Sequence, residues 1–180
     1  MLQSILTLIV DTIAGVLGGV LLLRFWMQVV RVRPPSSLGQ FVYQLTDWLV
    51  KPLRRIFPGV AGYDWASLVG AILVIVASIA IDLAILNRFS PSGLLLLSLL
   101  RLAEWVFYGF MGLILIEAVF SWVNPYAPMA PFVRALNDPL MRPLRRVVPP
   151  IANIDLSPLV ALLLLNIGLK LITYLVVTLA

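Results

Sequence analysis

The sequence contains neither cysteine nor histidine, and charged residues make up only 12% of its 180 positions. The missing cysteines exclude disulfides and thiolate chemistry. The missing histidines remove the usual zinc and haem ligand and the usual general base near neutral pH. Eight acidic residues and five methionines remain, but they form no recognisable ligand pattern. The sequence therefore predicts no enzyme, no metal site and no cofactor.

Apolar residues, in contrast, are abundant. They make up 62% of the chain, and the mean hydropathy is +1.06. A soluble domain is typically about 45–50% apolar, so the excess apolar surface of so small a chain is expected to face lipid.

Met1 to Asp11 carries no basic residue and is interrupted by Asp11, so we expect a first membrane helix rather than a signal peptide.

A basic motif occurs twice in the chain, 91 residues apart. Lys51-Pro52-Leu53-Arg54-Arg55 is followed by Pro58, and Arg142-Pro143-Leu144-Arg145-Arg146 is followed by Pro149. Two acidic positions recur at the same offset, Asp47 with Asp138 and Asp64 with Asp155. A repeat of half the chain predicts two tandem units, which we place at 1–90 and 91–180.

Four apolar segments are long enough to cross the roughly 30 Å hydrocarbon layer. We predict an all-α membrane protein with crossings at about 2–23, 65–86, 102–123 and 159–180. The start of the third is ambiguous, because the leucine-rich segment 94–100 precedes it and would also suit one long, tilted helix. In the first crossing, Gly15 and Gly19 form a GxxxG pair that predicts close helix packing.

Each unit also contains a short amphipathic segment before its basic motif. In the first unit, Ser36 or Ser37 is a candidate cap, and apolar residues at helical spacing form one face: Leu38, Phe41, Val42, Leu45, Trp48 and Leu49. Residues 131–141 are the counterpart. We expect both helices in the membrane interface; the alternative is a helix packed on the protein. The prolines of the basic motif are expected to turn the chain. Asp64 and Asp155 are expected to cap the crossings that follow, helped by Ser157 before Pro158.

The distribution of basic residues predicts the orientation. Six Lys or Arg residues lie between 24 and 64 and four between 124 and 155, whereas the middle segment has only Arg88 and Arg101. The positive-inside rule therefore places both basic segments in the cytoplasm and both termini outside. The two units then run in parallel, related by a pseudo-twofold axis along the membrane normal, which argues against an inverted-repeat transporter.

The basic motif supplies the candidate binding residues. Arginine forks suit phosphate, and basic residues beside an anionic leaflet favour lipid head groups; nucleic acid is not an expected partner. The alternative is structural, with the bases setting topology and pairing with the four acids, Asp47 with Lys51 and Asp138 with Arg142 at i+4. The candidates are Lys51, Arg54, Arg55, Arg142, Arg145 and Arg146, with Asp47, Asp64, Asp138 and Asp155 as structural acids.

Four charges interrupt the crossings: Asp11, Asp82, Glu117 and Lys170. An unpaired charge at mid-bilayer costs at least about 2.5–3.5 kcal/mol. Asp11 and Lys170 have similar expected depths and are candidates to pair. At an offset of 93, Asp11 aligns with Glu104 and Arg24 with Glu117. A buried structural pair and an ion or proton pathway both remain open, the latter requiring an oligomer because one chain has few polar lining residues.

The motifs together resemble the YggT family, also called YlmG. The second unit has the fuller signature: Ser121-Trp122, Asn137-Asp138-Pro139-Leu140, Arg142-Pro143-Leu144-Arg145-Arg146, Pro149-Pro150 and Asp155-Leu156-Ser157-Pro158. The first unit departs from it, with Trp48 and Gly59 in place of prolines and Asp64-Trp65-Ala66-Ser67 in place of Asp-Leu-Ser-Pro.

The resemblance implies a small bacterial inner-membrane or plastid protein with no agreed activity. Its members have been linked to osmotic or potassium homeostasis, to cell division and to assembly of a plastid cytochrome. We predict a scaffold or assembly factor with a basic platform for membrane lipids, acting as a homo-oligomer or in a membrane-protein complex. An ion channel or transporter is the alternative; a membrane enzyme is a weaker third.

Overall fold

The computed structural model describes residues 1–59, 62–148 and 155–179, and these residues form six helices. In chain order they are α1 (Leu2–Val29), α2 (Ser36–Ile56), α3 (Trp65–Ile85), α4 (Pro91–Val123), α5 (Ala130–Val147) and α6 (Ser157–Leu179). Four of them, α1, α3, α4 and α6, are long and apolar enough to cross a membrane. The prediction of an all-α, multi-pass membrane protein is confirmed.

Two of the crossing helices are longer than the sequence pattern suggested. α1 continues to Val29 instead of ending near residue 23, so Arg24 lies inside the helix and not in the loop after it. α4 is one helix of 33 residues, about 50 Å long, that includes the leucine-rich segment and Arg101. It begins where the Ser90 side chain accepts a hydrogen bond from the Gly93 amide at 3.1 Å. Arg24 and Arg101 are thus helix residues.

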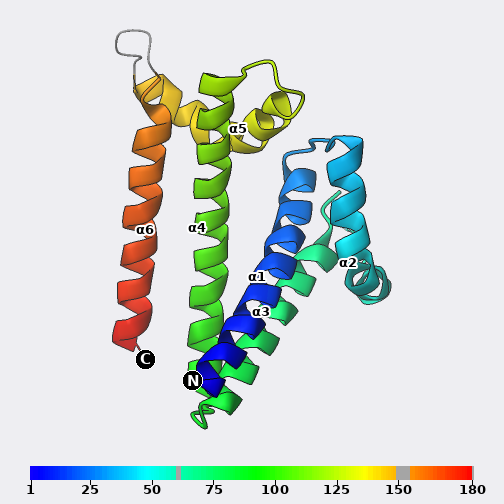
Figure 1. Cartoon of the computed structure of the whole chain (residues 1–180), viewed down its shortest axis with the longest axis vertical. Helices are drawn as coiled ribbons and strands as arrows, with labels where there is room; N and C mark the ends of the chain where they lie inside the picture. The colour runs from blue at the N-terminus through cyan, green and yellow to red at the C-terminus, as the bar shows by residue number, and fades with distance from the viewer. Residues whose placement is uncertain (60–61, 149–154, 180) are drawn as a thin grey trace.

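α2 and α5 contain the basic motifs. Figure 1 shows α5 across the end of the molecule opposite the two termini, and α2 running from that end down beside α1 and α3. Two of the motif prolines, Pro52 and Pro143, do not turn the chain as expected. Pro58 follows the end of α2, and Pro149 lies outside the described residues. Pro52 lies inside α2, and Pro139 and Pro143 lie inside α5. Each removes one backbone donor from its helix without ending it. The cap expected at Ser36 or Ser37 is also absent, because the N-cap position is Pro35 and has no side-chain hydrogen bond.

The apolar surface of α2 is divided between protein and surroundings. Val42, Thr46 and Val50 are fully buried against the bundle, whereas Phe41 and Trp48 are more than half exposed. The three buried residues are four positions apart and the two exposed residues seven apart, so each group lies on one stripe of the helix. One stripe therefore packs on the protein, as the second alternative held, and the interfacial position of the exposed stripe stays a prediction.

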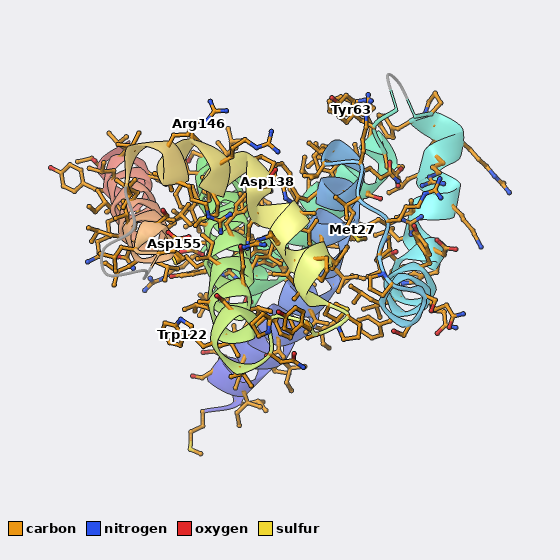
Figure 2. The ribbon with its side chains drawn as sticks, turned by 90° about the horizontal axis from the view of Figure 1, so that it is seen from above. Met27, Tyr63, Trp122, Asp138, Arg146 and Asp155 are labelled. Atoms are coloured by element: carbon orange, nitrogen blue, oxygen red, sulfur yellow. The ribbon has the colours of Figure 1, made fainter. Side chains whose placement is uncertain are left out.

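The two repeats pack side by side. α3 and α1 both contact α4, and Figure 1 shows α1 and α4 running in the same direction. Trp26 of α1 donates a hydrogen bond to the Leu136 carbonyl of α5 at 2.9 Å, and the same indole meets Phe110 edge-on at 5.0 Å. Met27 lies at this junction, near the centre of Figure 2, within a core cluster that includes Val42 and Leu136.

The close approach expected at Gly15 and Gly19 occurs instead at Gly18. No atom would lie within 4 Å of a Cβ at either of the first two, whereas a Cβ on Gly18 would lie 1.8 Å from the Trp105 ring. The GxxxG prediction is therefore wrong in its residues. α1 does use a glycine for close packing, but against an indole of α4.

Candidate functional site

Arg24 is the centre of a buried ion-pair network in the first repeat. Its side chain is 4% exposed, and it reaches from α1 to α2 and to the start of α3. One guanidinium nitrogen, Nη1, donates to Thr46 Oγ1 at 2.6 Å and to Asp47 Oδ1 at 2.8 Å. Its Nε lies 3.4 Å from Asp64 Oδ2. The arginine therefore ties three helices together.

Asp64 forms an ion pair with a second arginine. Arg54 of the basic motif donates from Nε to Oδ1 at 3.1 Å and from Nη2 to Oδ2 at 2.6 Å, a bidentate pair. The Ser67 hydroxyl donates to Oδ2 at 2.7 Å. Burial by itself raises the pKa of Asp64, but the hydrogen bonds from Arg54 and Ser67 and the charges of Arg54 and Arg24 outweigh it, so that pKa lies below its usual range.

The second repeat has a network at the same place with Glu117 at its centre. Glu117 of α4 is 11% exposed and accepts from Arg145 Nη2 at 2.8 Å. The Asn137 amide of α5 donates to Glu117 Oε2 at 2.8 Å, and Arg134 Nε lies 3.8 Å from Oε1. Arg145 also donates from Nε to Asp155 Oδ2 at 3.1 Å. One motif arginine thus links α4, α5 and the start of α6.

The two networks are related by the repeat with their charges reversed. Arg24 and Glu117 are equivalent at an offset of 93, and Thr46 and Asn137 at an offset of 91. In the first network the central Arg24 is a donor, and the Thr46 hydroxyl oxygen accepts its hydrogen bond. In the second network the central Glu117 is an acceptor, and the Asn137 amide donates to it. Complementarity survives the change of sign, which indicates that both centres stabilise the fold.

The remaining motif residues lie on the surface. The predicted i+4 pairs are confirmed, because Lys51 Nζ lies 3.0 Å from Asp47 Oδ2 and Arg142 is bonded to Asp138. Arg55 and Arg146 are exposed and form no ion pair within the described part of the chain. Figure 2 shows Arg146 projecting from α5 away from the bundle. The six basic candidates therefore form three pairs: Arg54 and Arg145 bond to the networks, Lys51 and Arg142 pair with acids on their own helices, and Arg55 and Arg146 point outward.

The predicted capping aspartates behave differently from each other. Asp64 occupies the N-cap position of α3, but its side chain makes no capping bond to a backbone amide; its oxygens are taken by the network. Asp155 Oδ1 does accept from the Ser157 amide at 2.9 Å. Burial raises the pKa of Asp155, yet the bonds from Ser157 and the pair with Arg145 lower it below its ordinary value. Ser157 itself is the first residue of α6 rather than its cap.

The intramembrane charges do not pair as the sequence suggested. Asp11 Oδ1 accepts from Arg101 Nη1 at 2.6 Å, so Arg101 and not Lys170 is its partner. Asp11 and Asp82 both line a cleft of about 490 Å³ between α1, α3 and α4. Lys170 is exposed on α6 and lines a second cleft. Across the described residues, no group of three or more acidic side chains could hold a metal ion.

A comparison with known proteins identifies the family. The CCB3/YggT family model matches residues 3–86 and 96–176, one segment in each repeat. The chain belongs to the CCB3/YggT family. It is 35% identical over 175 residues to an uncharacterized protein of Pseudomonas aeruginosa, covering 94% of this chain and 86% of the relative. It is 34% identical to the uncharacterized protein YggT of Escherichia coli, covering 92% and 87%. No solved structure matches.

In this CCB3/YggT protein, the residues that carried the family resemblance are largely those of the buried networks. Arg145 and Asp155 come from the fuller motif of the second repeat, and Arg54 and Asp64 are their counterparts. The central residues, Arg24 and Glu117, lie outside the motif. Their alignment at an offset of 93 was the signal in the sequence that could have identified them as equivalent centres of the two networks. The expected helix end at residue 23 placed Arg24 in a loop and so concealed its role.

Proposed function

We propose that this protein is a non-enzymatic scaffold or assembly factor of the bacterial inner membrane, with α2 and α5 at the cytoplasmic face as a platform for anionic lipid head groups and partners. Its family membership and multi-pass architecture support a membrane role without naming an activity. The basic residues gathered on α2, α5 and the adjoining loops favour the cytoplasmic side for that face.

One observation carries the proposal. Arg55 and Arg146 are repeat-equivalent, exposed and outside the ion pairs, and each is followed by an exposed apolar residue, Ile56 at 70% and Val147 at 79%. An arginine beside an exposed aliphatic side chain suits a membrane surface, where the charge meets a phosphate and the apolar group enters the acyl boundary. Lys51, Arg54, Arg142 and Arg145 are engaged by acids instead.

Lipid binding by the purified protein tests this division. Phosphatidylglycerol affinity is measured against phosphatidylcholine for the wild type and two double variants. Arg55→Gln with Arg146→Gln should lower affinity by about thirtyfold, since each basic residue near an anionic surface contributes roughly 1 kcal/mol. The matched control, Lys51→Gln with Arg142→Gln, should lose much less because those cations already face carboxylates. Equal losses, or no preference for phosphatidylglycerol, would contradict the proposal.

The second candidate is an ion channel or transporter role in osmotic homeostasis. The cleft between α1, α3 and α4 favours it, because Asp11, Asp82, Arg101 and Glu104 line a polar space within the apolar bundle. Potassium or proton flux from proteoliposomes, changed by Asp82→Asn, would support this candidate. Proteoliposomes without flux, from protein that co-purifies with a membrane complex, would support the scaffold.

A further inference from the structure

The molecule contains two clefts that are related by the internal repeat. The first, of about 490 Å³, is lined in the first repeat by Asp11, Ile79, Asp82, Leu83 and Leu86, among others. The second, of about 590 Å³, is lined at the equivalent positions of the second repeat by Glu104, Lys170, Thr173, Tyr174 and Val177. The offset is 93 for the acid on the first helix of each pair and 91 for the other positions. Both clefts are therefore the same structural feature.

Only the first cleft is covered by a third helix. α4 lies across it, contributing Leu97, Leu100, Arg101 and Glu104 to its lining, so Glu104 lies between the two clefts. Arg101 places its guanidinium 2.6 Å from Asp11, so the acid of the first cleft has a basic partner. The described residues that line the second cleft all belong to α4 and α6, the two helices that form it. In the described part of the chain, no third helix contributes to this lining.

The charges of the second cleft are left incomplete in the same way. Lys170 is exposed on α6 and forms no ion pair with any described residue. Glu104, the equivalent of Asp11, has only a 3.7 Å approach from Arg101, which is already engaged by Asp11. A lysine with no ion pair among the described residues is costly in lipid, and so is a glutamate that shares its one arginine with Asp11. A second cation near Glu104 and an anion near Lys170 would lower that cost.

We propose that a second copy of this chain covers the α4–α6 cleft, forming a twofold dimer in which Lys170 of each copy pairs with Glu104 of the other. A twofold axis along the membrane normal brings equivalent residues of two parallel copies together at the same depth, and it requires a self-complementary surface. The cleft carries one charge of each sign and satisfies that requirement. This dimer is independent of what α2 and α5 bind.

Lys170 of a second copy suits Glu104 better than any other basic residue in this half of the molecule. In the half of the molecule away from α2 and α5, the basic residues are Arg88, Arg101 and Lys170. Arg101 is held by Asp11, and Arg88 lies in the turn between α3 and α4. Lys170 of a second copy is therefore the cation available for Glu104 at the right depth.

Cross-linking in the native membrane tests the interface first. Because the chain has no cysteine, Thr173→Cys introduces a single thiol in the cleft, and Ile81→Cys introduces one on the exposed face of α3 as the control. A short bis-maleimide reagent should join two Thr173→Cys chains and leave Ile81→Cys chains unjoined. Equal cross-linking at both positions, or none at Thr173→Cys, would overturn the proposal.

A charge exchange then distinguishes pairing between chains from pairing within one chain. Energy transfer between donor- and acceptor-labelled copies in phospholipid vesicles measures dimer formation. Lys170→Met should weaken the dimer by about tenfold, because it removes both Lys170–Glu104 contacts and one interhelical polar contact in a bilayer is typically worth roughly threefold. Lys170→Glu alone and Glu104→Lys alone should each abolish self-association, because like charges then face each other.

The decisive measurement mixes those two single variants. A Lys170→Glu chain beside a Glu104→Lys chain has complementary charges at both contacts, so the mixture should regain energy transfer that neither variant shows alone. If the mixture stays monomeric while Lys170→Met retains wild-type dimerisation, the dimer does not use this cleft. A wild type that is monomeric, with phospholipid or a different protein in the cleft, would also overturn the inference.

Discussion

At the scale of single residues, the two repeats keep the position of their buried networks but not the sign. Arg24 and Glu117 occupy equivalent places. One arginine of each basic motif, Arg54 or Arg145, bonds to the network of its repeat. Arg54 binds only the acid at the helix start, because its neighbour Arg24 is also a cation. Arg145 binds both Asp155 and the central Glu117. Local electrostatic complementarity, rather than residue identity, relates the two halves.

The Arg24 network leads to a stability prediction. Arg24→Met should lower the free energy of unfolding by about 3 kcal/mol, because removing one member of a buried ion pair leaves the charge of its partners less well compensated. The loss should stay near the lower end of the usual range, since Arg54 still holds Asp64 and Lys51 still faces Asp47. Unfolding in mild detergent measures it. Arg33→Met, on the exposed loop, is the control, and a loss no larger than that of the control would contradict the network's role.

The same carboxylates predict how stability depends on pH. The pKa values of Asp64 and Asp155 lie below their ordinary range, because arginine pairs and serine hydrogen bonds outweigh burial. An acid with a lowered folded pKa stabilises the protein above its unfolded value of about 3.9 and loses that contribution as pH falls further. Stability should therefore be steady above about pH 5 and fall from about pH 4 downward.

Thermal unfolding at successive pH values checks this expectation. Asp64→Asn removes the most buried of these carboxylates, so the variant should be less stable at pH 7 and show a shallower loss in acid. A wild-type curve that stays flat to pH 3, or an Asp64→Asn curve as steep as the wild type's, would show that the network does not control acid stability.

At the scale of elements, α2 and α5 each have a face that packs on the bundle and a face that is exposed, and the amphipathic pattern in the sequence does not separate the two. The buried stripe of α2 holds Thr46 and Val50 against the bundle, and the neighbouring stripe leaves Phe41 and Trp48 outward. The prolines are tolerated inside both helices, so the basic motif is helical and its residues alternate between inward and outward directions. That helical spacing is why Arg54 and Arg145 point into the networks while Arg55 and Arg146, one position later, point outward.

At the scale of the whole molecule, the two repeats run in the same direction. Figure 1 shows both termini at one end, α5 at the other end, and α2 beside the half of α1 that lies toward α5. Counting Arg24, Arg101 and Lys170 as helix residues leaves nine basic residues on the α2 and α5 side and only Arg88 on the other. The charge asymmetry that predicts orientation therefore becomes sharper, not weaker.

A reporter fusion tests that orientation. Alkaline phosphatase attached after the C-terminal residue should be active, because we expect this end outside the cytoplasm. A fusion made after Phe57, at the end of α2, should be inactive and serves as the matched control. An inactive C-terminal fusion with fluorescence from a green fluorescent protein at the same site would reverse the orientation.

The sequence by itself determined the class of this protein and much of its plan. Long apolar segments give four crossings because lipid excludes unpaired backbone groups, and the 91-residue offset revealed the repeat and the surface pairs Asp47–Lys51 and Asp138–Arg142. These features depend on composition and on contacts within one helix, which spacing alone can express.

Only the tertiary structure decided which charges meet across helices. Arg24 pairs with Asp47 and Asp64 because α1 continues to Val29, nearly two turns past the expected end. Asp11 pairs with Arg101 because α4 begins before the expected crossing and lies against α1. Equal depth could not choose between Arg101 and Lys170, since depth says nothing about which helices are neighbours. Helix length and lateral packing set the partners, and both arise from contacts far apart in the chain.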